Sequence, residues 1–308
     1  MSTVTVVAPR PNPSRLIAGY VEFTKPRIVM LVMVTGVPAL LIAARGMPAT
    51  RVALAGMIGT ALAAMSASCF NHYYDRDIDG LMRRTAGRPL PSGMIPPSHA
   101  LILGFGLGIA ALGILGWFTN LLAAALGLAS IVYYAVVYTV WLKRRTPQNI
   151  VIGGAAGASA PMIAWAAVTG EVSFAAVLLS SIVFLWTPPH FWALALYRSE
   201  DYARAGIPML PVTHGEVETR RQIVLYSWIL VPVTLSLWPL GLVGPVYLIP
   251  AVLLGAEFLR RVHRLRGSGS IPDAVGVFRY SIAYLLLLYF ALTADAIVRY
   301  VVPGIAAG

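Results

Sequence analysis

The chain has 308 residues, of which 58% are hydrophobic and only 11% are charged. Soluble domains carry ~25% charged residues, so this chain has too little polar surface to cover a water-soluble globule, and its composition predicts a membrane protein. The net charge of +11 comes from basic residues clustered between apolar runs, which membrane topology explains without nucleic-acid binding.

The chain begins with a polar, proline-rich stretch, residues 1–24, which lacks the apolar core and cleavage site of a secretory signal. We expect it to be a cytoplasmic N-terminal segment. Nine apolar runs follow, each long enough to cross a hydrocarbon layer of about 30 Å as a helix. They lie near 28–44, 52–70, 100–118, 121–141, 149–168, 174–193, 223–241, 244–260 and 278–301.

These runs predict an all-α polytopic membrane protein, with nine transmembrane helices surrounding a central apolar cavity. We expect a single nine-helix domain at 25–303 and a C-terminal tail at 304–308. Of the 23 lysines and arginines, all but Arg45, Arg51 and Arg299 fall on the side of the N-terminus. Because basic loops stay in the cytoplasm, this predicts a cytoplasmic N-terminus, a C-terminus across the inner membrane, and an active site facing the cytoplasm.

Polar residues follow the second run at intervals of four. Asn71, Asp75 and Asp79 would share one face of a helix, because each step of four residues turns about 400°. Asp77 would point elsewhere, toward solvent, a cap or a basic neighbour. Carboxylates at a membrane boundary are usually functional or paired. The spacing therefore predicts a stripe of oxygen ligands at the cytoplasmic end of the second span.

Such oxygen ligands suit Mg²⁺, which binds one or two protein carboxylates together with phosphate oxygens. Arg83, Arg84 and Arg88 follow the stripe, and guanidinium groups match phosphate geometry. Lys143 and Arg144 lie on the same side and could also reach a diphosphate, or could serve topology alone. We predict a metal-bridged diphosphate as ligand; the alternative is a solvated loop whose acids and arginines pair with one another.

The N-x-x-x-D-x-x-x-D pattern at 71–79 resembles the first motif of the UbiA-type intramembrane prenyltransferases. Three longer strings are similar to the protoheme IX farnesyltransferases, the heme O synthases of that superfamily. They are NHYYDRDIDGLMRRTAGRPLPSG at 71–93, NIVIGGAAGASAPMIAW at 149–165 and WTPPHFWALALYRSEDYARAGIPMLPV at 186–212. The resemblance extends from about residue 20 to residue 300.

The resemblance implies transfer of a farnesyl group from farnesyl diphosphate to a vinyl group of heme B, giving heme O. It implies Mg²⁺ as cofactor, with Asp75 and Asp79 serving catalysis, and the lipid bilayer as surroundings. It leaves open a homo-oligomer or a downstream heme-processing partner. The nearest alternative is a prenyltransferase of the same superfamily that acts on an aromatic quinone precursor or chlorophyllide. A secondary transporter fits less well, because its polar groups would lie near the bilayer midplane.

The second acidic motif of the superfamily is altered in this sequence. After the sixth span only Glu200 and Asp201 are acidic, and adjacent residues lie about 100° apart on a helix. Quinone-type relatives are expected to have spaced aspartates there. The altered motif therefore argues against a second Mg²⁺ held entirely by protein ligands, although Glu200 or Asp201 could hold one through water.

His190 follows two prolines, Pro188 and Pro189, which should kink or end the sixth span. A neutral imidazole there could contact heme, accept a proton or orient a water, and the resemblance makes His190 a catalytic candidate. The alternative is an interfacial histidine within an aromatic belt. Asn149, at the start of the fifth span, is expected to line the cavity or to link helices.

Overall fold

The protein is described by a computed structural model that covers residues 12–302. Within this range every regular element is helical, in agreement with the all-α prediction. The parts of the predicted N-terminal segment at 1–11 and of the C-terminal tail at 304–308 lie outside the described residues. The helices are α1 (Pro13–Phe23), α2 (Pro26–Ala44), α3 (Thr50–Asp79), α4 (Pro97–Phe118), α5 (Leu121–Val132), η1 (Tyr133–Leu142), α6 (Asn149–Gly157), α7 (Ser159–Thr169), α8 (Phe174–Tyr197), α9 (Ser199–Arg204), α10 (Leu210–Thr213), α11 (Gly215–Leu235), α12 (Pro245–Ser268), α13 (Ile271–Ala296) and η2 (Ile297–Val301).

Each of the nine apolar runs overlaps a helix or two consecutive helices, although the seventh, 223–241, extends beyond the end of α11 at Leu235. The fourth run is α5 continued by the π-helix η1, and the fifth is α6 and α7, which meet at Ala158. Seven of the resulting helical segments in residues 12–302 are long and apolar enough to cross a membrane, and α11 and α12 are not among them. The structure is that of a multi-pass membrane protein, and the count of nine crossings stays a prediction.

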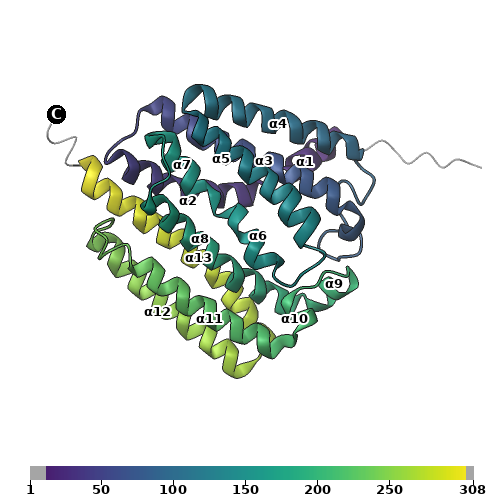
Figure 1. Ribbon diagram of the computed structural model, residues 1–308. Helices are drawn as coiled ribbons and strands as arrows, with labels where there is room; N and C mark the ends of the chain where they lie inside the picture. Colours follow the sequence, from purple (N-terminus) through teal and green to yellow (C-terminus); the bar gives the residue numbers. More distant parts are fainter. Residues whose placement is uncertain (1–11, 303–308) are drawn as a thin grey trace, which may run out of the picture.

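The helices form one bundle whose two ends carry different features. Figure 1 shows α1, α9 and α10 toward one end and the C-terminal end of α13 at the other. The helix pairs that pack most extensively are α3 with α4, α12 with α13, α2 with α7 and α8 with α11. The bundle therefore holds the long polar connections and short helices at the end where the acidic stripe lies.

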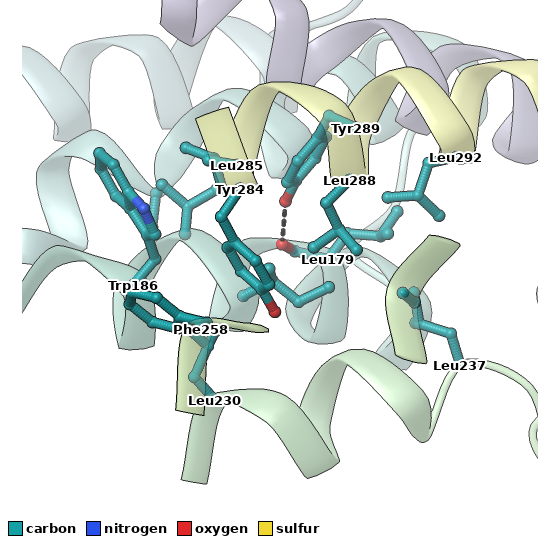
Figure 2. Close-up of a cluster of buried hydrophobic side chains, with 14 of the residues drawn as sticks. Leu179, Trp186, Leu230, Leu237, Phe258, Tyr284, Leu285, Leu288, Tyr289 and Leu292 are labelled. Carbon is teal, nitrogen blue, oxygen red and sulfur yellow. Dashed lines mark hydrogen bonds between the residues drawn. The ribbon is translucent and has the colours of Figure 1, made fainter. Parts of the chain in front are cut away.

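The largest buried cluster joins α8, α11, α12 and α13 (Figure 2). The rings of Phe258 and Tyr284 stack with centroids 5.0 Å apart. The Tyr289 hydroxyl donates a 2.7 Å hydrogen bond to the Leu179 carbonyl, which satisfies a polar atom that would be costly to leave unpaired in this apolar setting. These contacts fix α13 against α8, the helix that carries His190.

Candidate active site

The acidic stripe lies on one continuous helix. Helix α3 extends nine residues beyond the predicted span of 52–70 and ends at Asp79. Asn71, Asp75 and Asp79 are 3%, 0% and 2% exposed, so all three are turned into the protein. The Asn71 side-chain amide donates a 2.6 Å hydrogen bond to Asp75. The structure thus brings together the side chains that the spacing of four predicted on one face.

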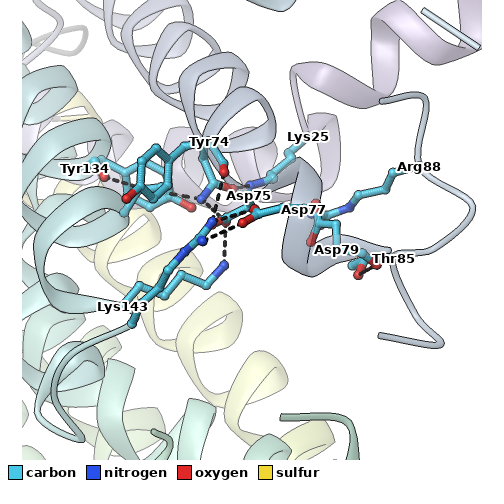
Figure 3. Close-up of polar contacts among 12 residues, drawn as sticks. Lys25, Tyr74, Asp75, Asp77, Asp79, Thr85, Arg88, Tyr134 and Lys143 are labelled. Atoms are coloured by element: carbon cyan, nitrogen blue, oxygen red, sulfur yellow. Dashed lines mark hydrogen bonds and ion pairs between the residues drawn. The ribbon is translucent and has the colours of Figure 1, made fainter. Parts of the chain in front are cut away.

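Asp75 is surrounded by donors but keeps one free oxygen. The Lys143 ammonium lies 2.5 Å from Asp75 Oδ2, which also accepts the hydrogen bond from Asn71 (Figure 3). The other oxygen, Oδ1, is buried and has no hydrogen-bond partner, and Arg144 Nη2 is 3.8 Å away from it. A buried carboxylate oxygen without a donor is costly, and it is suited to a ligand that brings positive charge.

Asp79 is held by the polypeptide that follows it. Arg88 Nη1 lies 2.6 Å from Asp79 Oδ2, and the Thr85 hydroxyl donates to the Asp79 carbonyl at 2.8 Å. The loop after α3 therefore folds back over the end of its own helix. Arg83 and Arg84 are exposed on this loop and form no ion pair with any residue in the described range.

Lys25 is a site residue that the sequence analysis did not single out. It is the residue before α2, has a left-handed backbone conformation with φ 46°, and donates through Nζ to Asn71 Oδ1 at 2.6 Å. Its ammonium also lies 5.8 Å from the ring centroid of Tyr134. With Lys143 and Arg88, three cations surround two buried carboxylates, so the site has an excess of positive charge that suits a polyanion.

Arg144 binds mainly to the aspartate outside the stripe. Two of its guanidinium nitrogens each lie 2.7 Å from an oxygen of Asp77, whose side chain is 60% exposed. The hydrogen bond to Asp77 raises the pKa of Arg144 above its usual value. Asp77 thus has a basic neighbour, one of the three surroundings predicted for it.

Glu200 and Asp201 lie in the first turn of the short helix α9. Asp201 is buried and pairs with Arg204 and, at 3.7 Å, with Arg198, whereas Glu200 is exposed. The next residue, Tyr202, packs in one cluster with Ile78 and Ile150, so α9 adjoins the end of α3. Burial raises the pKa of Tyr202 above its usual value.

An apolar cavity of about 200 Å³ opens beside the acidic stripe. Tyr134, which faces Lys25, also lines this cavity, so the two features adjoin. Helix η1 connects them too, because its Thr139 hydroxyl accepts a 3.2 Å hydrogen bond from Asn71. The lining residues are Ile28, Leu31, Val32, Thr35, Tyr134, Tyr138, Ile150, Gly153, Gly154, Gly157, Val183, Trp186, Thr187, His190, Phe191 and Leu285.

His190 lies in the wall of this cavity. Its ring is stacked between Trp186, at a centroid distance of 4.3 Å, and Phe278, at 4.7 Å. Its Nδ1 lies 2.7 Å from the Ser281 hydroxyl oxygen of α13. The structure therefore places His190 where a molecule in the cavity could contact it.

Asn149 adjoins the cavity without lining it. Its side chain is fully buried and donates a 2.6 Å hydrogen bond to the Thr146 carbonyl, which closes the turn before α6. Its Oδ1 is buried without a hydrogen-bond partner among residues 12–302. The adjacent Ile150 is the residue that reaches the cavity wall.

The donors on α3 fit the predicted magnesium ion. Within residues 12–302, no group of three or more His, Cys, Asp or Glu side chains could hold a metal by itself. Mg²⁺ needs only one or two carboxylates when a phosphate and waters supply the other oxygens. The two buried carboxylates of Asp75 and Asp79, the Asn71 amide oxygen and the unpaired Asp75 Oδ1 meet that requirement.

Solved structures with low sequence identity share this fold. A structure described as concerning digeranylgeranylglyceryl phosphate synthase has a TM-score of 0.76 at 19% identity and covers 91% of this chain and 98% of its own. A UbiA homologue from Archaeoglobus fulgidus, described as bound to DMAPP and Mg²⁺, has a TM-score of 0.63 at 18% identity and covers 89% and 99%.

Sequence relatives are much closer. A protoheme IX farnesyltransferase of Ectopseudomonas mendocina is 49% identical over 90% of this chain and 92% of its own length, and one of Jannaschia sp. is 47% identical over 91% and 93%. A relative of the same name from Roseiflexus sp. is 47% identical over 92% of this chain, which spans only 53% of that longer protein. The UbiA prenyltransferase family model matches residues 31–282. The resemblance is confirmed, and the chain belongs to the UbiA prenyltransferase family.

Proposed function

We propose that the protein transfers a farnesyl group from farnesyl diphosphate to a vinyl group of heme B, making heme O. The observation that carries the proposal is the buried Asp75 carboxylate, with one unpaired oxygen, inside a group of three cations at the edge of an apolar cavity. This arrangement has a charged end for a diphosphate and an apolar space for its hydrocarbon chain. The relatives named protoheme IX farnesyltransferase support the choice of donor and acceptor.

In this proposal the basic residues bind the leaving group. Lys25, Lys143 and Arg88 lie at the acidic stripe. Arg83 and Arg84, on the loop that follows α3, and Arg144, which is paired with Asp77, are further candidates. They stabilise the negative charge that develops on the diphosphate as its carbon–oxygen bond breaks. Because Lys25, Lys143 and Arg88 are already held by hydrogen bonds or ion pairs before the reaction, little reorganisation opposes that step.

Asn71, Asp75 and Asp79 would hold Mg²⁺, with Asp75 and Asp79 the catalytically important pair. The bound ion would supply Lewis acidity toward the diphosphate oxygens. Glu200 and Asp201 could hold a second ion through water, although the salt bridges of Asp201 to Arg198 and Arg204 compete with that role. The stripe on α3 is therefore the principal metal site of the proposal.

The cavity protects the allylic cation that the loss of diphosphate leaves. Its apolar lining excludes water, and the faces of Tyr134 and Tyr138 can stabilise positive charge. The terminal vinyl carbon of heme B forms a bond to the farnesyl carbon, water adds to the neighbouring carbon, and that water loses a proton. At about 200 Å³ the cavity is below the ~300–1,000 Å³ of pockets that enclose ligands of drug size, so a tetrapyrrole acceptor requires its wall to move.

We further propose that residues 25–303 act as one transmembrane prenyltransferase domain in the cytoplasmic membrane. The N-terminus and the active site would face the cytoplasm, where the basic loops stay during insertion. Accessibility labelling of single cysteines in the 80–96 loop and in the 236–244 turn, in sealed inverted vesicles, tests this orientation. Labelling of the 80–96 loop only after the vesicles are opened would contradict it.

The activity is tested with the purified protein, farnesyl diphosphate, heme B and Mg²⁺, with products separated by mass. We expect a product with the mass of heme B plus farnesyl plus water, and its loss when EDTA is added. Parallel reactions with an aromatic quinone precursor and with chlorophyllide as acceptors test the nearest alternatives. Prenylation of one of these but not of heme B would reject the proposed acceptor.

A further inference from the structure

The hydrogen bonds of Ser281 determine which nitrogen of His190 carries a proton. The Ser281 hydroxyl oxygen lies 2.6 Å from the Phe278 carbonyl oxygen and 2.7 Å from His190 Nδ1. A carbonyl can only accept, so the single hydroxyl hydrogen of Ser281 is directed at Phe278. The Ser281 oxygen must then accept from His190, which makes Nδ1 the protonated nitrogen.

The surroundings of the ring favour its neutral form. Trp186 and Phe278 cover the two faces of His190, and Phe191 meets it edge to face. Within residues 12–302, no carboxylate pairs with His190. A buried charge without a partner is costly, so the imidazole is neutral and its other nitrogen, Nε2, has a free lone pair.

Ser281 is itself fixed by a second hydrogen bond from the same helix. The Trp186 indole nitrogen donates to the Ser281 carbonyl at 2.7 Å, and Ser281 is fully buried. Two side chains of α8, one turn apart, therefore bind one residue of α13. This double contact sets both the position and the rotation of the His190 ring in the cavity wall.

We propose that Ser281 is a positioning residue that holds His190 as the Nδ1–H tautomer and so directs the Nε2 lone pair to the cavity. This role of Ser281 deepens the proposed function and rests on it for one step of the reaction, which is the addition of water to the cation left after the carbon–carbon bond forms. The water oxygen bonds to carbon, one water proton moves to Nε2, and the hydroxyl group remains on the product.

The tautomer is measured directly, without any reaction. The protein is labelled with ¹⁵N-histidine, and the His190→Gln variant identifies the signals of His190 among the five histidines of the chain. We expect a protonated Nδ1 and an unprotonated Nε2 in the unmodified protein and in Ser281→Thr, which keeps the hydroxyl. A protonated Nε2 in the unmodified protein overturns the proposal and needs no variant to fold.

Removing the hydroxyl should change both the tautomer and the rate. In Ser281→Ala we expect the Nε2–H form to appear and turnover to fall about 10- to 100-fold, by analogy with the loss of hydrogen-bond partners that orient metal-binding histidines. Ser281→Thr should recover most of the turnover. Ser227→Ala is the matched control, because Ser227 is also fully buried and binds only a carbonyl of its own helix, at 2.7 Å.

The outcomes separate this inference from the proposed function. If the unmodified protein has the Nδ1–H tautomer but does not prenylate heme B, the proposed function is wrong. The proposal that Ser281 positions His190 would still stand. A Ser281→Ala protein that keeps the original tautomer overturns the positioning role. Equal losses of turnover in Ser281→Ala and Ser227→Ala would overturn it as well, because they would reflect packing alone.

Discussion

The Lys143 ammonium lies 2.5 Å from the Asp75 carboxylate, although 68 residues separate the two in sequence. Asp75 is fully buried on α3, and Lys143 follows the last residue of η1. Removing one partner of a buried ion pair leaves an uncompensated charge. Before any substrate binds, Asp75 is therefore paired with a cation that a diphosphate would also attract.

Replacing Asp75 with Asn should abolish most of the activity while the protein remains folded in the membrane. The amide keeps the size of the side chain but loses the charge and the free oxygen lone pairs that the proposed metal site needs. We expect turnover to fall by about 100-fold or more, the scale seen when a charge-stabilising group is lost. Turnover is measured with saturating substrates over a range of Mg²⁺ concentrations.

The matched control is Asp77→Asn on the same helix. Asp77 is exposed and binds Arg144 outside the stripe, so its loss should change turnover by no more than about twofold, as for most surface positions. Equal losses of turnover in the Asp75 and Asp77 variants would mean that the net negative charge at this end of α3 is what matters, and that Asp75 has no specific role. Unchanged turnover in Asp75→Asn would contradict the metal assignment.

Lys25→Met should weaken binding of the prenyl diphosphate. Lys25 donates to Asn71 and lies at the edge of the cavity, so we expect it to contact the diphosphate as well. A hydrogen bond to a charged group contributes about 1.5–3 kcal/mol, so kcat/KM for farnesyl diphosphate should fall about 10- to 100-fold. Initial rates at varied farnesyl diphosphate and fixed heme B test this.

Two further variants show whether the effect is local. Lys25→Arg keeps the charge and should recover part of the lost kcat/KM. Arg27→Met removes a cation two residues away that is exposed, and it should leave kcat/KM within about twofold of the unmodified protein. If Arg27→Met lowers kcat/KM as much as Lys25→Met, both residues act through the general positive electrostatic potential of this segment, and Lys25 makes no specific contact with the diphosphate.

The sequence predicted those features that depend on local periodicity. The apolar runs located the helices, and the spacing of Asn71, Asp75 and Asp79 predicted their common face because an α-helix repeats every 3.6 residues. The role of Lys143 remained open, because topology explained a basic cluster at the end of a span equally well. Its contact with Asp75 is a tertiary one that no spacing reveals.

Other features of the site could not be predicted in this way. Lys25 was counted only as a basic residue on the cytoplasmic side, yet its left-handed backbone turns it toward Asn71. The π-helix η1, which brings Thr139 to Asn71, has no signature in the apolar run that contains it. π-Helical turns occur often at functional sites, and η1 packs here against α3, α5 and α6, which are contacts that the apolar run itself does not reveal.

Replacing Glu200 and Asp201 together with Gln and Asn should reduce activity less than Asp75→Asn does. Asp201 is neutralised by Arg198 and Arg204, and Glu200 is exposed, so neither provides a free buried oxygen like that of Asp75. Turnover of the double variant is compared with Asp75→Asn at several Mg²⁺ concentrations. Complete loss in a double variant that remains folded would mean that a second metal is essential.

Gly153→Ala should distort the cavity wall, because Gly153 packs directly against the ring of Tyr138. A Cβ at Gly153 would lie 2.2 Å from Tyr138 Cδ2, far inside contact distance, so the ring or the helix must move. Overpacking of this kind costs about 1–3 kcal/mol of stability. Displacement of a substrate-lining side chain by about 1 Å can lower turnover as much as 100-fold. We therefore expect a lower unfolding temperature together with lower turnover.

The control is Gly113→Ala on α4, where a new Cβ would meet no atom within 4 Å. There alanine should maintain or raise stability, because it favours a helix more than glycine does. Combining Gly153→Ala with Tyr138→Leu tests the cause, since the smaller side chain leaves room for the new methyl group. Recovery of the unfolding temperature in the double variant would locate the strain at this contact. If the unfolding temperature does not recover, the close approach of Tyr138 is not the reason that position 153 requires glycine. The cause would then lie in the backbone of α6.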